Sequence, residues 1–143
     1  MIKGLAEYEK LSDRVRATEA GLREHLFGPN PAAEVSLAYL GEEPVGFAVF
    51  FPSFSTFACQ PGIYLEDLFI EPAWRGRGFG RQLLAHVARV GAARGCQSMN
   101  WSVLPWNKPA IDFYRGLGAE PVTEWAGFRI AGEAFSRLAR ESA

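Results

Sequence analysis

The sequence has few of the side chains that build metal centres and disulfide frameworks. Its 143 residues include two cysteines, Cys59 and Cys96, and two histidines, His25 and His86. The cysteines are too far apart for a metal-site spacing and the histidines show no partner spacing, so we expect no metal. Two thiols without a disulfide framework suit a reducing compartment, and we predict a cytoplasmic protein.

Long hydrophobic runs and an excess of one charge are also missing. No stretch approaches the roughly 20 consecutive apolar residues that cross a membrane, and the first residues lack the basic region and apolar run of a secretion signal. The formal net charge is −1, which gives no broad attraction to nucleic acid or to a membrane surface. These absences argue against nucleic-acid and membrane partners.

The apolar content is sufficient for one folded domain. Hydrophobic residues make up 48% of the chain and charged residues 22%, and no linker or repeat divides it. We therefore predict a single domain over residues 1–143, which buries roughly two thirds of the surface that its unfolded chain would expose.

Hydrophobic periodicity and turn residues predict an α+β fold, in which a mixed sheet is flanked by helices. Helical spacing at residues 2–8 and an N-cap at Thr18 indicate two N-terminal helices. Phe54 and Phe57 lie in a predicted loop at 53–62, where they either line a pocket or join the core. The further predicted elements are strands at 35–40, 45–51 and 63–70, a helix at 79–94, a strand at 99–103, a helix after Asn107, closing strands within 122–130 and a helix at 133–140.

A strand that runs into a turn rich in arginine and glycine is the most informative motif. Residues 75–80 read Arg-Gly-Arg-Gly-Phe-Gly and open the helix that follows. The glycines leave backbone N–H groups uncovered, and the helix start adds free amides and a positive dipole end, so the motif predicts a pyrophosphate site. The alternative is a turn that merely starts a helix. Arg81 and Gln82 stand where a Walker loop requires Lys and Ser or Thr, which argues against nucleotide hydrolysis.

A second motif begins at Asn107 and ends at Gly118. Its sequence is Asn-Lys-Pro-Ala-Ile-Asp-Phe-Tyr-Arg-Gly-Leu-Gly. Asn107 is well placed as an N-cap, and Tyr114 follows it by two helical turns, so both side chains can face one side of the helix. For Tyr114 the alternative to a chemical role is packing beside Phe113.

These motifs resemble those of the GNAT superfamily of N-acetyltransferases. Arg75, Gly78 and Gly80 match its acyl-CoA-binding pattern, (Arg/Gln)-x-x-Gly-x-(Gly/Ala), and residues 107–118 match Asn-x-x-Ala-x-x-Phe-Tyr-x-x-x-Gly. Together with residues 5–9, 64–67 and 125–130, the chain is similar to the diamine acetyltransferase branch, which includes polyamine and thialysine acetyltransferases. The amine-pocket pattern of that branch is incomplete, because residues 57–59 lack its tryptophan.

The resemblance implies the mixed three-layer α/β GNAT fold, with its first strand absent from this sequence. The chain opens inside what resembles the family's first helix, so we expect that a strand and half a helix normally precede it. The edge of the strand at 35–40 would then be bare, and an uncovered edge invites pairing with another chain. We therefore expect a homodimer, with exchange of terminal segments as one form of it.

The resemblance also implies the reaction, which is acetyl-CoA-dependent transfer of an acetyl group to a primary amine of a small molecule. A di- or polyamine or a thialysine-like compound would attack directly in a ternary complex, without an acyl-enzyme. Amino acids, protein N-termini or lysines remain alternative acceptors. A CoA-binding module without catalysis is the alternative from another class.

The site residues follow from the matching positions. Tyr114 would be the general acid, since a phenol of reference pKa about 10 stays protonated at neutral pH. Glu66 would be the base through water, unless it is only a solvated strand residue, and adjacent Glu66 and Asp67 should point to opposite faces of the strand. Expected cofactor-binding residues are Leu68, Phe69, Ile70, Arg75, Gly76, Arg77, Gly78, Phe79, Gly80, Asn107 and Tyr114, and expected amine-binding residues are Glu9, Glu66, Asp67 and Trp125.

Overall fold

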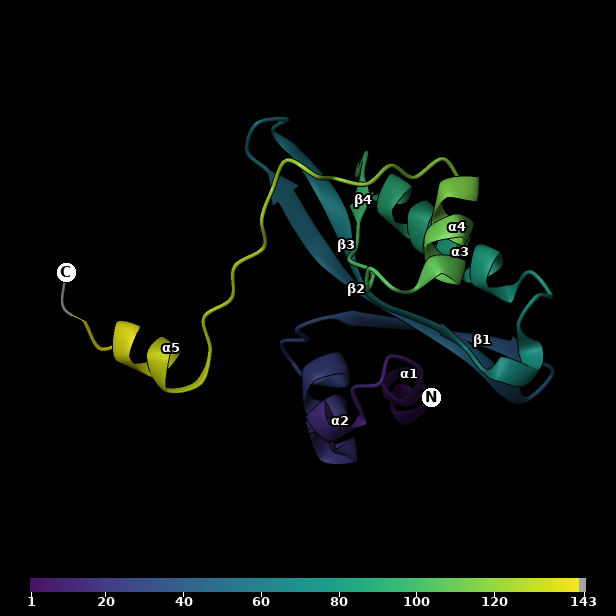
Figure 1. Cartoon of the computed structure of the whole chain (residues 1–143), viewed down its shortest axis with the longest axis horizontal. Helices are drawn as coiled ribbons and strands as arrows, with labels where there is room; N and C mark the ends of the chain where they lie inside the picture. Colours follow the sequence, from purple (N-terminus) through teal and green to yellow (C-terminus); the bar gives the residue numbers. More distant parts are fainter. Residues whose placement is uncertain (142–143) are drawn as a thin grey trace. The chain divides into compact units, whose positions relative to one another are not determined.

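The structure is a computed structural model that describes residues 1–141. The chain divides into two compact units, with the boundary between Leu104 and Pro105. Its elements in chain order are α1 (Ile2–Tyr8), η1 (Ser12–Arg14), α2 (Glu19–Phe27), β1 (Glu34–Leu40), β2 (Glu43–Ser55), β3 (Gln60–Ile70), η2 (Pro72–Trp74), α3 (Phe79–Ala93), β4 (Met99–Asn100), α4 (Lys108–Gly116) and α5 (Gly132–Leu138) (Figure 1).

The first unit is built on a mixed four-stranded sheet of order β1-β2-β3-β4. β1, β2 and β3 form an antiparallel meander. β4 pairs in parallel with β3 through Ile63 with Met99 and Tyr64 with Asn100. The predicted mixed sheet is confirmed, although β4 is shorter than the predicted strand because residues 101–104 leave the ladder before Pro105.

Helices cover both faces of this sheet, with α1 and α2 on one side and α3 on the other (Figure 1). The predicted N-cap of α2 and the predicted glycine after α3 are both observed. Thr18 Oγ1 accepts a hydrogen bond from the Gly21 amide at 3.1 Å, which caps α2. Gly95 follows α3 with φ of 79°, the left-handed conformation that ends helices.

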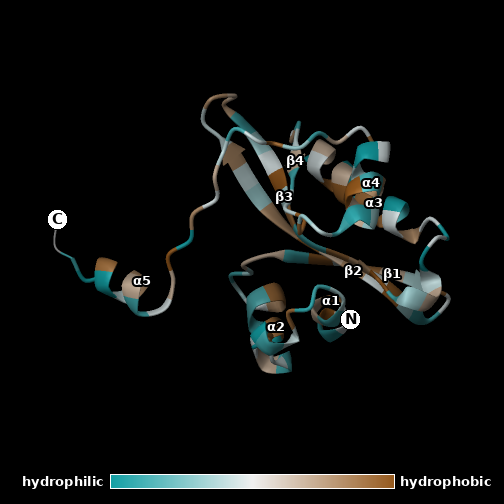
Figure 2. Ribbon diagram, viewed as in Figure 1, coloured by the Kyte–Doolittle hydropathy of each residue, from teal (hydrophilic) through white to brown (hydrophobic). Residues whose placement is uncertain are grey.

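The core lies between the sheet and α3. It continues on the opposite face near the end of β3, where buried Phe69 packs against Gly4 of α1. Figure 2 shows hydrophobic stretches on the strands and a mixture of hydrophobic and hydrophilic residues on α3, as expected of a helix with one buried face. The buried hydrophobic residues are Val45, Phe47, Ala48, Phe50, Ile63, Leu65, Phe69, Leu83, Leu84 and Val87.

The hairpin between β2 and β3 is longer than predicted. The pairs Phe54 with Pro61 and Ser55 with Gln60 continue the ladder into the expected loop, so only residues 56–59 form the turn. Phe54 and Phe57 are both exposed there, and Phe57 is 93% exposed. The interpretation of these two rings as core residues is therefore wrong.

The second unit contains α4 and α5, joined by residues 117–131. The prediction of closing strands within 122–130 is wrong, because the described chain has no strand there. A strand needs a partner for its backbone, and residues 105–141 of the second unit offer none. The apolar side chains of this segment remain exposed, namely Val122, Trp125, Phe128 and Ile130. No helix of the described chain is long and apolar enough to cross a membrane.

Candidate active site

The turn between η2 and α3 is shaped as an anion cradle. Gly76 and Gly78 have φ of 73° and 86°, a conformation that favours glycine. A Cβ atom built on Gly76 would meet nothing within 4 Å, and one on Gly78 would meet only the Gln82 side-chain nitrogen, at 3.8 Å. The backbone of this turn therefore faces open space, where a bulky group can approach it closely.

The start of α3 supplies the donors of this cradle. Gly78 is the N-cap, and the first intrahelical bond runs from the Gln82 amide to the Gly78 carbonyl at 3.0 Å. The preceding amides, from Phe79 to Arg81, have no acceptor within the helix, because the first amides of any helix lack one. Free amides and the positive helix end favour a phosphate group at this place.

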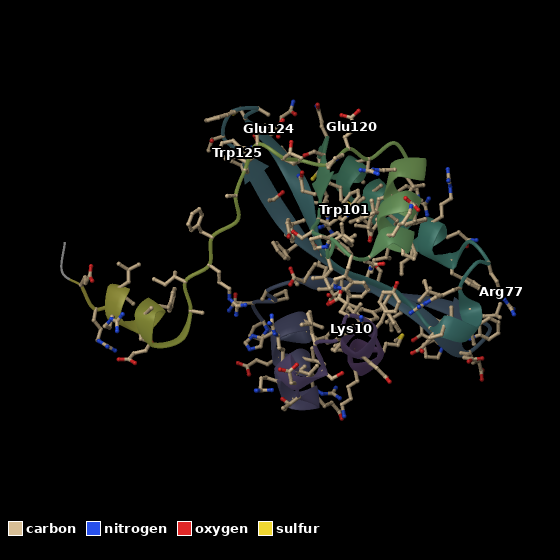
Figure 3. The ribbon with its side chains drawn as sticks, viewed as in Figure 1. Lys10, Arg77, Trp101, Glu120, Glu124 and Trp125 are labelled. Carbon is tan, nitrogen blue, oxygen red and sulfur yellow. The ribbon has the colours of Figure 1, made fainter. Side chains whose placement is uncertain are left out.

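The arginines of the turn contact aromatic rings. The Arg77 guanidinium lies 4.8 Å from the Trp74 ring centroid, and Figure 3 labels Arg77 on this turn. Trp74 in turn donates through Nε1 to Glu43 Oε1 at 3.4 Å. The guanidinium of Arg75 lies 4.7 Å from the Tyr8 ring centroid. Both arginines of the turn thus contact aromatic rings, and the Gln82 side-chain nitrogen lies near Gly78 as a further donor.

The edge of β3 opens beyond its short pairing with β4. The Ile63 amide donates to the Ser98 carbonyl at 3.0 Å, and pairing with β4 stops one residue later, at Tyr64. From Leu65 to Ile70 the described chain gives β3 a strand partner on the β2 side only. The predicted cofactor residues Leu68, Phe69 and Ile70 lie on this splayed segment, just before the cradle.

A β-bulge places Glu66 outside the strand register. Leu65 pairs with Phe50 and Asp67 with Val49, so two residues of β2 face three of β3 and Glu66 has no partner on β2. A bulge breaks the alternation of side chains. Ile63 contacts Gly91 of α3, whereas Phe69, six residues later, contacts Gly4 of α1 on the opposite face.

The bulge interrupts the regular alternation from which opposite faces were expected for Glu66 and Asp67. An even spacing would keep Ile63 and Phe69 on one face of an unbroken strand. Bulges are frequent beside active sites, where they redirect a side chain. Glu66 is exposed, and Asp67 is half-buried.

Three carboxylates from α1 and β3 form an acidic cluster, which consists of Glu9, Glu66 and Asp67. Burial, together with the negative charges of Glu66 and Glu9, raises the pKa of Asp67 to about 6. Burial also raises the pKa of Glu9, the C-cap residue of α1. Each ionised carboxylate makes ionisation of its neighbours costlier, so a bound cation would stabilise the ionised cluster.

The remaining predicted residues belong to the second unit. Asn107 is the N-cap of α4, as expected, and its Oδ1 accepts from the Ala110 amide at 3.4 Å. The Tyr114 ring lies 5.3 Å from that of Phe113. Trp125 lies on the extended segment before α5 and is 75% exposed (Figure 3).

Two polar contributions were missed by sequence reasoning. Gln82 projects toward the cradle, and its place four residues after Gly78, on the first helical turn, was a signal for it. Tyr64 and Ser102 share a hydrogen bond of 3.0 Å between the β3 edge and the segment after β4, and the sequence holds no signal for that pair. Within residues 1–141 no three His, Cys, Asp or Glu side chains group as a metal site.

Comparison with known proteins identifies the family of this chain. Residues 4–119 match the model of the acetyltransferase (GNAT) family. A thialysine N-epsilon-acetyltransferase of Sus scrofa is 41% identical over 150 residues, covering 97% of this chain and 88% of the relative. An L-ornithine N5-acetyltransferase of Arabidopsis thaliana is 27% identical over 183 residues, covering 96% and 80%.

A solved structure confirms the fold. An integron cassette protein from the mobile metagenome of V. cholerae superposes with a TM-score of 0.80 at 28% identity, covering 96% of this chain and 86% of that one. The family match, the curated relatives and the fold agree with the glycine turn before α3. The chain belongs to the GNAT family and is an N-acetyltransferase.

Proposed function

We propose that this enzyme transfers the acetyl group of acetyl-CoA to a primary amine of a small cationic molecule, of the thialysine, ornithine or polyamine kind. The observation that carries the proposal is the main-chain cradle before α3. The names of the relatives and the acidic cluster support a cationic acceptor.

The cradle fits the pyrophosphate of CoA. Positive φ angles at Gly76 and Gly78 turn backbone toward open space that a Cβ would fill, and α3 adds free amides. We assign the pyrophosphate to residues 75–80 and the adjoining part of the cofactor to residues 68–70. Asn107 and Tyr114 join this set through the motif of residues 107–118. When bound, acetyl-CoA supplies an activated acetyl thioester.

Glu66 is the proposed base. A carboxylate is a far weaker base than an alkyl amine, because reference pKa values are about 4.3 for a glutamate side chain and about 10.4 for an alkyl ammonium. Direct removal of the ammonium proton is therefore unfavourable, and Glu66 acts through water or on amine that has already lost a proton. The bulge that takes Glu66 out of the ladder supports this role.

Tyr114 is the proposed general acid, and backbone amides of residues 68–70 are the proposed oxyanion donors. A phenol keeps its proton at neutral pH and can give it to a departing thiolate. The support for Tyr114 is its place in the Asn-x-x-Ala-x-x-Phe-Tyr motif. The support for the amides is the β3 edge, which has no β4 partner after Tyr64 in the described chain.

The acidic cluster is the proposed amine site. Asp67 and Glu9 would attract and orient the ammonium groups of the acceptor, because their ionised forms are costly without a cation. Trp125 would cover the alkyl chain of the acceptor with its aromatic face. An amino acid or a protein terminus is the second kind of acceptor that this cluster could take.

We further propose that the whole chain acts as one domain and forms a homodimer in a reducing, cytoplasmic compartment. The family match, over residues 4–119, continues from the first unit into the first part of the second. Exposed Leu37 and Tyr39 on the β1 edge, and the exposed apolar side chains within 122–130, support association of two copies. The free thiols of Cys59 and Cys96 suit a reducing compartment. Light scattering at micromolar concentration tests the dimer, and a stable monomer would contradict it.

The experiment that tests the activity is release of free CoA from acetyl-CoA with a panel of amines. We expect turnover with thialysine, ornithine or a polyamine, and less turnover with a matched amine that carries a single positive charge. Turnover with protein N-termini alone would show that the acceptor is a protein and not a small molecule. Binding of CoA with no turnover on any amine would favour the CoA-binding module.

A further inference from the structure

Arg75, the arginine that opens the cofactor motif, makes several contacts with other residues of the first unit. The Arg75 guanidinium lies 4.7 Å from the ring centroid of Tyr8 and 5.4 Å from that of Phe69. Its Nε donates to the Ile70 carbonyl at 2.9 Å. One side chain thus contacts the last residue of α1 and the last two residues of β3.

Helix α1 depends on such contacts. It has seven residues, and helices of this length are unstable in isolation. Near its start, Gly4 packs so closely on Phe69 that an added Cβ would lie 3.1 Å from the ring. Near its end, Tyr8 receives the Arg75 guanidinium, and Glu9 of the acidic cluster follows as the C-cap. Both ends of α1 are therefore held against the Phe69 region.

We propose that Arg75 is a positioning residue that couples the cofactor turn to the amine site through Tyr8. This inference rests on the proposed function and deepens it. The Arg75 side chain begins on the turn and contacts Tyr8 at the end of α1. The position of Glu9, the next residue after Tyr8, therefore depends on the conformation of residues 70–75. The role uses the planar face and the Nε donor of an arginine, and a lysine supplies neither.

A charge role and a positioning role make different predictions. If Arg75 served only as a cation for the pyrophosphate, Arg75→Lys would preserve CoA binding, and amine binding would be unaffected. If Arg75 positions α1, Arg75→Lys and Arg75→Met should behave alike. We expect both to raise the KM for the amine by about 3- to 10-fold, the scale of a lost cation–π contact and hydrogen bond.

Variants of Tyr8 separate the two roles further. Tyr8→Leu should raise the amine KM as Arg75→Met does, whereas Tyr8→Phe keeps an aromatic ring and should stay closer to the wild type. The double variant Tyr8→Leu/Arg75→Met should show no larger change than Arg75→Met alone, since both remove one contact. Arg89→Met, which removes an exposed arginine of α3, is the matched control.

The decisive measurements are the amine KM and the salt dependence of the CoA dissociation constant. Salt weakens exposed charge pairs, so loss of a phosphate-binding cation would flatten that dependence. We expect the slope of Arg75→Met to equal that of the wild type, together with a raised amine KM. A flattened slope with an unchanged amine KM, rescue by lysine, or additive effects in the double variant would overturn the proposal.

An unfolding experiment keeps this test separate from the proposed function. Denaturant midpoints of the wild type, Tyr8→Leu, Arg75→Met and the double variant need no ligand. We expect the two changes to be coupled, and additive changes would contradict the contact itself. If the wild type does not bind CoA but the two changes are coupled, the proposed function is wrong. The contact between Arg75 and α1 would then be only structural, and the positioning role would be overturned.

Discussion

The cradle of residues 75–80 and the acidic cluster of Glu9, Glu66 and Asp67 belong to the same unit but are built in different ways. The cradle consists of consecutive residues and offers backbone amides. The acidic cluster joins the end of α1 to a bulge in β3 and offers side-chain charge. A main-chain site should be insensitive to pH and to most side-chain changes, whereas a carboxylate site should be sensitive to both.

The largest effect should come from filling the cradle. Gly78→Asp would place a carboxylate where the phosphate binds, and the left-handed backbone, with φ of 86°, would cost a side chain about 1–2 kcal/mol, which is small enough for the fold to remain. We expect calorimetry to detect no CoA binding. The matched control is Gly95→Asp, at another glycine of positive φ in open space, which follows the opposite end of α3. Equal loss in both variants would show that backbone strain, and not the carboxylate, is responsible.

The next largest effect concerns proton transfer. Tyr114→Phe removes a proton donor but keeps the ring, and kcat should fall on the order of 100-fold, as expected for a general acid. The dissociation constant of acetyl-CoA should change little. Tyr39→Phe, at an exposed tyrosine of β1, is the control. Unchanged turnover in Tyr114→Phe would reduce Tyr114 to a packing residue beside Phe113.

A smaller effect, with a distinct pH dependence, should come from the acidic cluster. The amine stays fully charged below pH 8, so a fall in pH through about 6 neutralises Asp67 and not the acceptor. The amine KM should therefore rise below pH 6, while the dissociation constant of CoA stays constant. Asp67→Asn should raise the KM on the order of 10-fold at pH 8 and remove this pH dependence. A pH profile like that of the wild type would exclude Asp67 from the amine site.

The same carboxylate makes a prediction for stability. The pKa of Asp67 is raised from 3.8 to about 6 in the folded state, so the folded protein binds more protons than the unfolded chain between these values. Its contribution to stability therefore falls as pH rises through this window. Asp67→Asn should raise the melting temperature at pH 8 more than at pH 4. An equal shift at both pH values would contradict the raised pKa.

The smallest effect should come from Arg77. Its guanidinium stacks on Trp74, so its main contribution to the cradle is the backbone amide, which substitution leaves in place. Arg77→Ala should raise the dissociation constant of CoA by about 2- to 3-fold, the scale of a screened surface charge. A loss as large as that of Gly78→Asp would show that side-chain charge, and not the main chain, holds the pyrophosphate.

The sequence predicts the cradle better than the acidic cluster because their signals differ in range. Gly76, Gly78 and the helix start are adjacent in the chain, so residue types alone reveal their geometry. The Thr18 and Asn107 caps are equally local and were predicted. The bulge at Glu66 depends on the register against β2, and the contact between Arg75 and Tyr8 joins residues 67 positions apart. No local pattern reports such pairings.

The segment 122–130 also shows that local sequence does not report long-range strand pairing. Its apolar residues favour a strand by local propensity, yet the described part of the second unit has no strand to pair with it. Strand formation requires a partner that local sequence does not specify. The extent of the β2 and β3 hairpin was underestimated for a similar reason, since cross-strand pairing continues through residues with loop-like composition.

Calorimetric titration of the wild-type protein tests the central claim most directly. CoA, desulfo-CoA and pantetheine differ in the thiol and in the pyrophosphate, and the cradle is predicted to recognise the pyrophosphate. We expect CoA and desulfo-CoA to bind with similar affinity and pantetheine to bind far more weakly. Absence of CoA binding at millimolar concentration, or equal binding of pantetheine, would contradict the account.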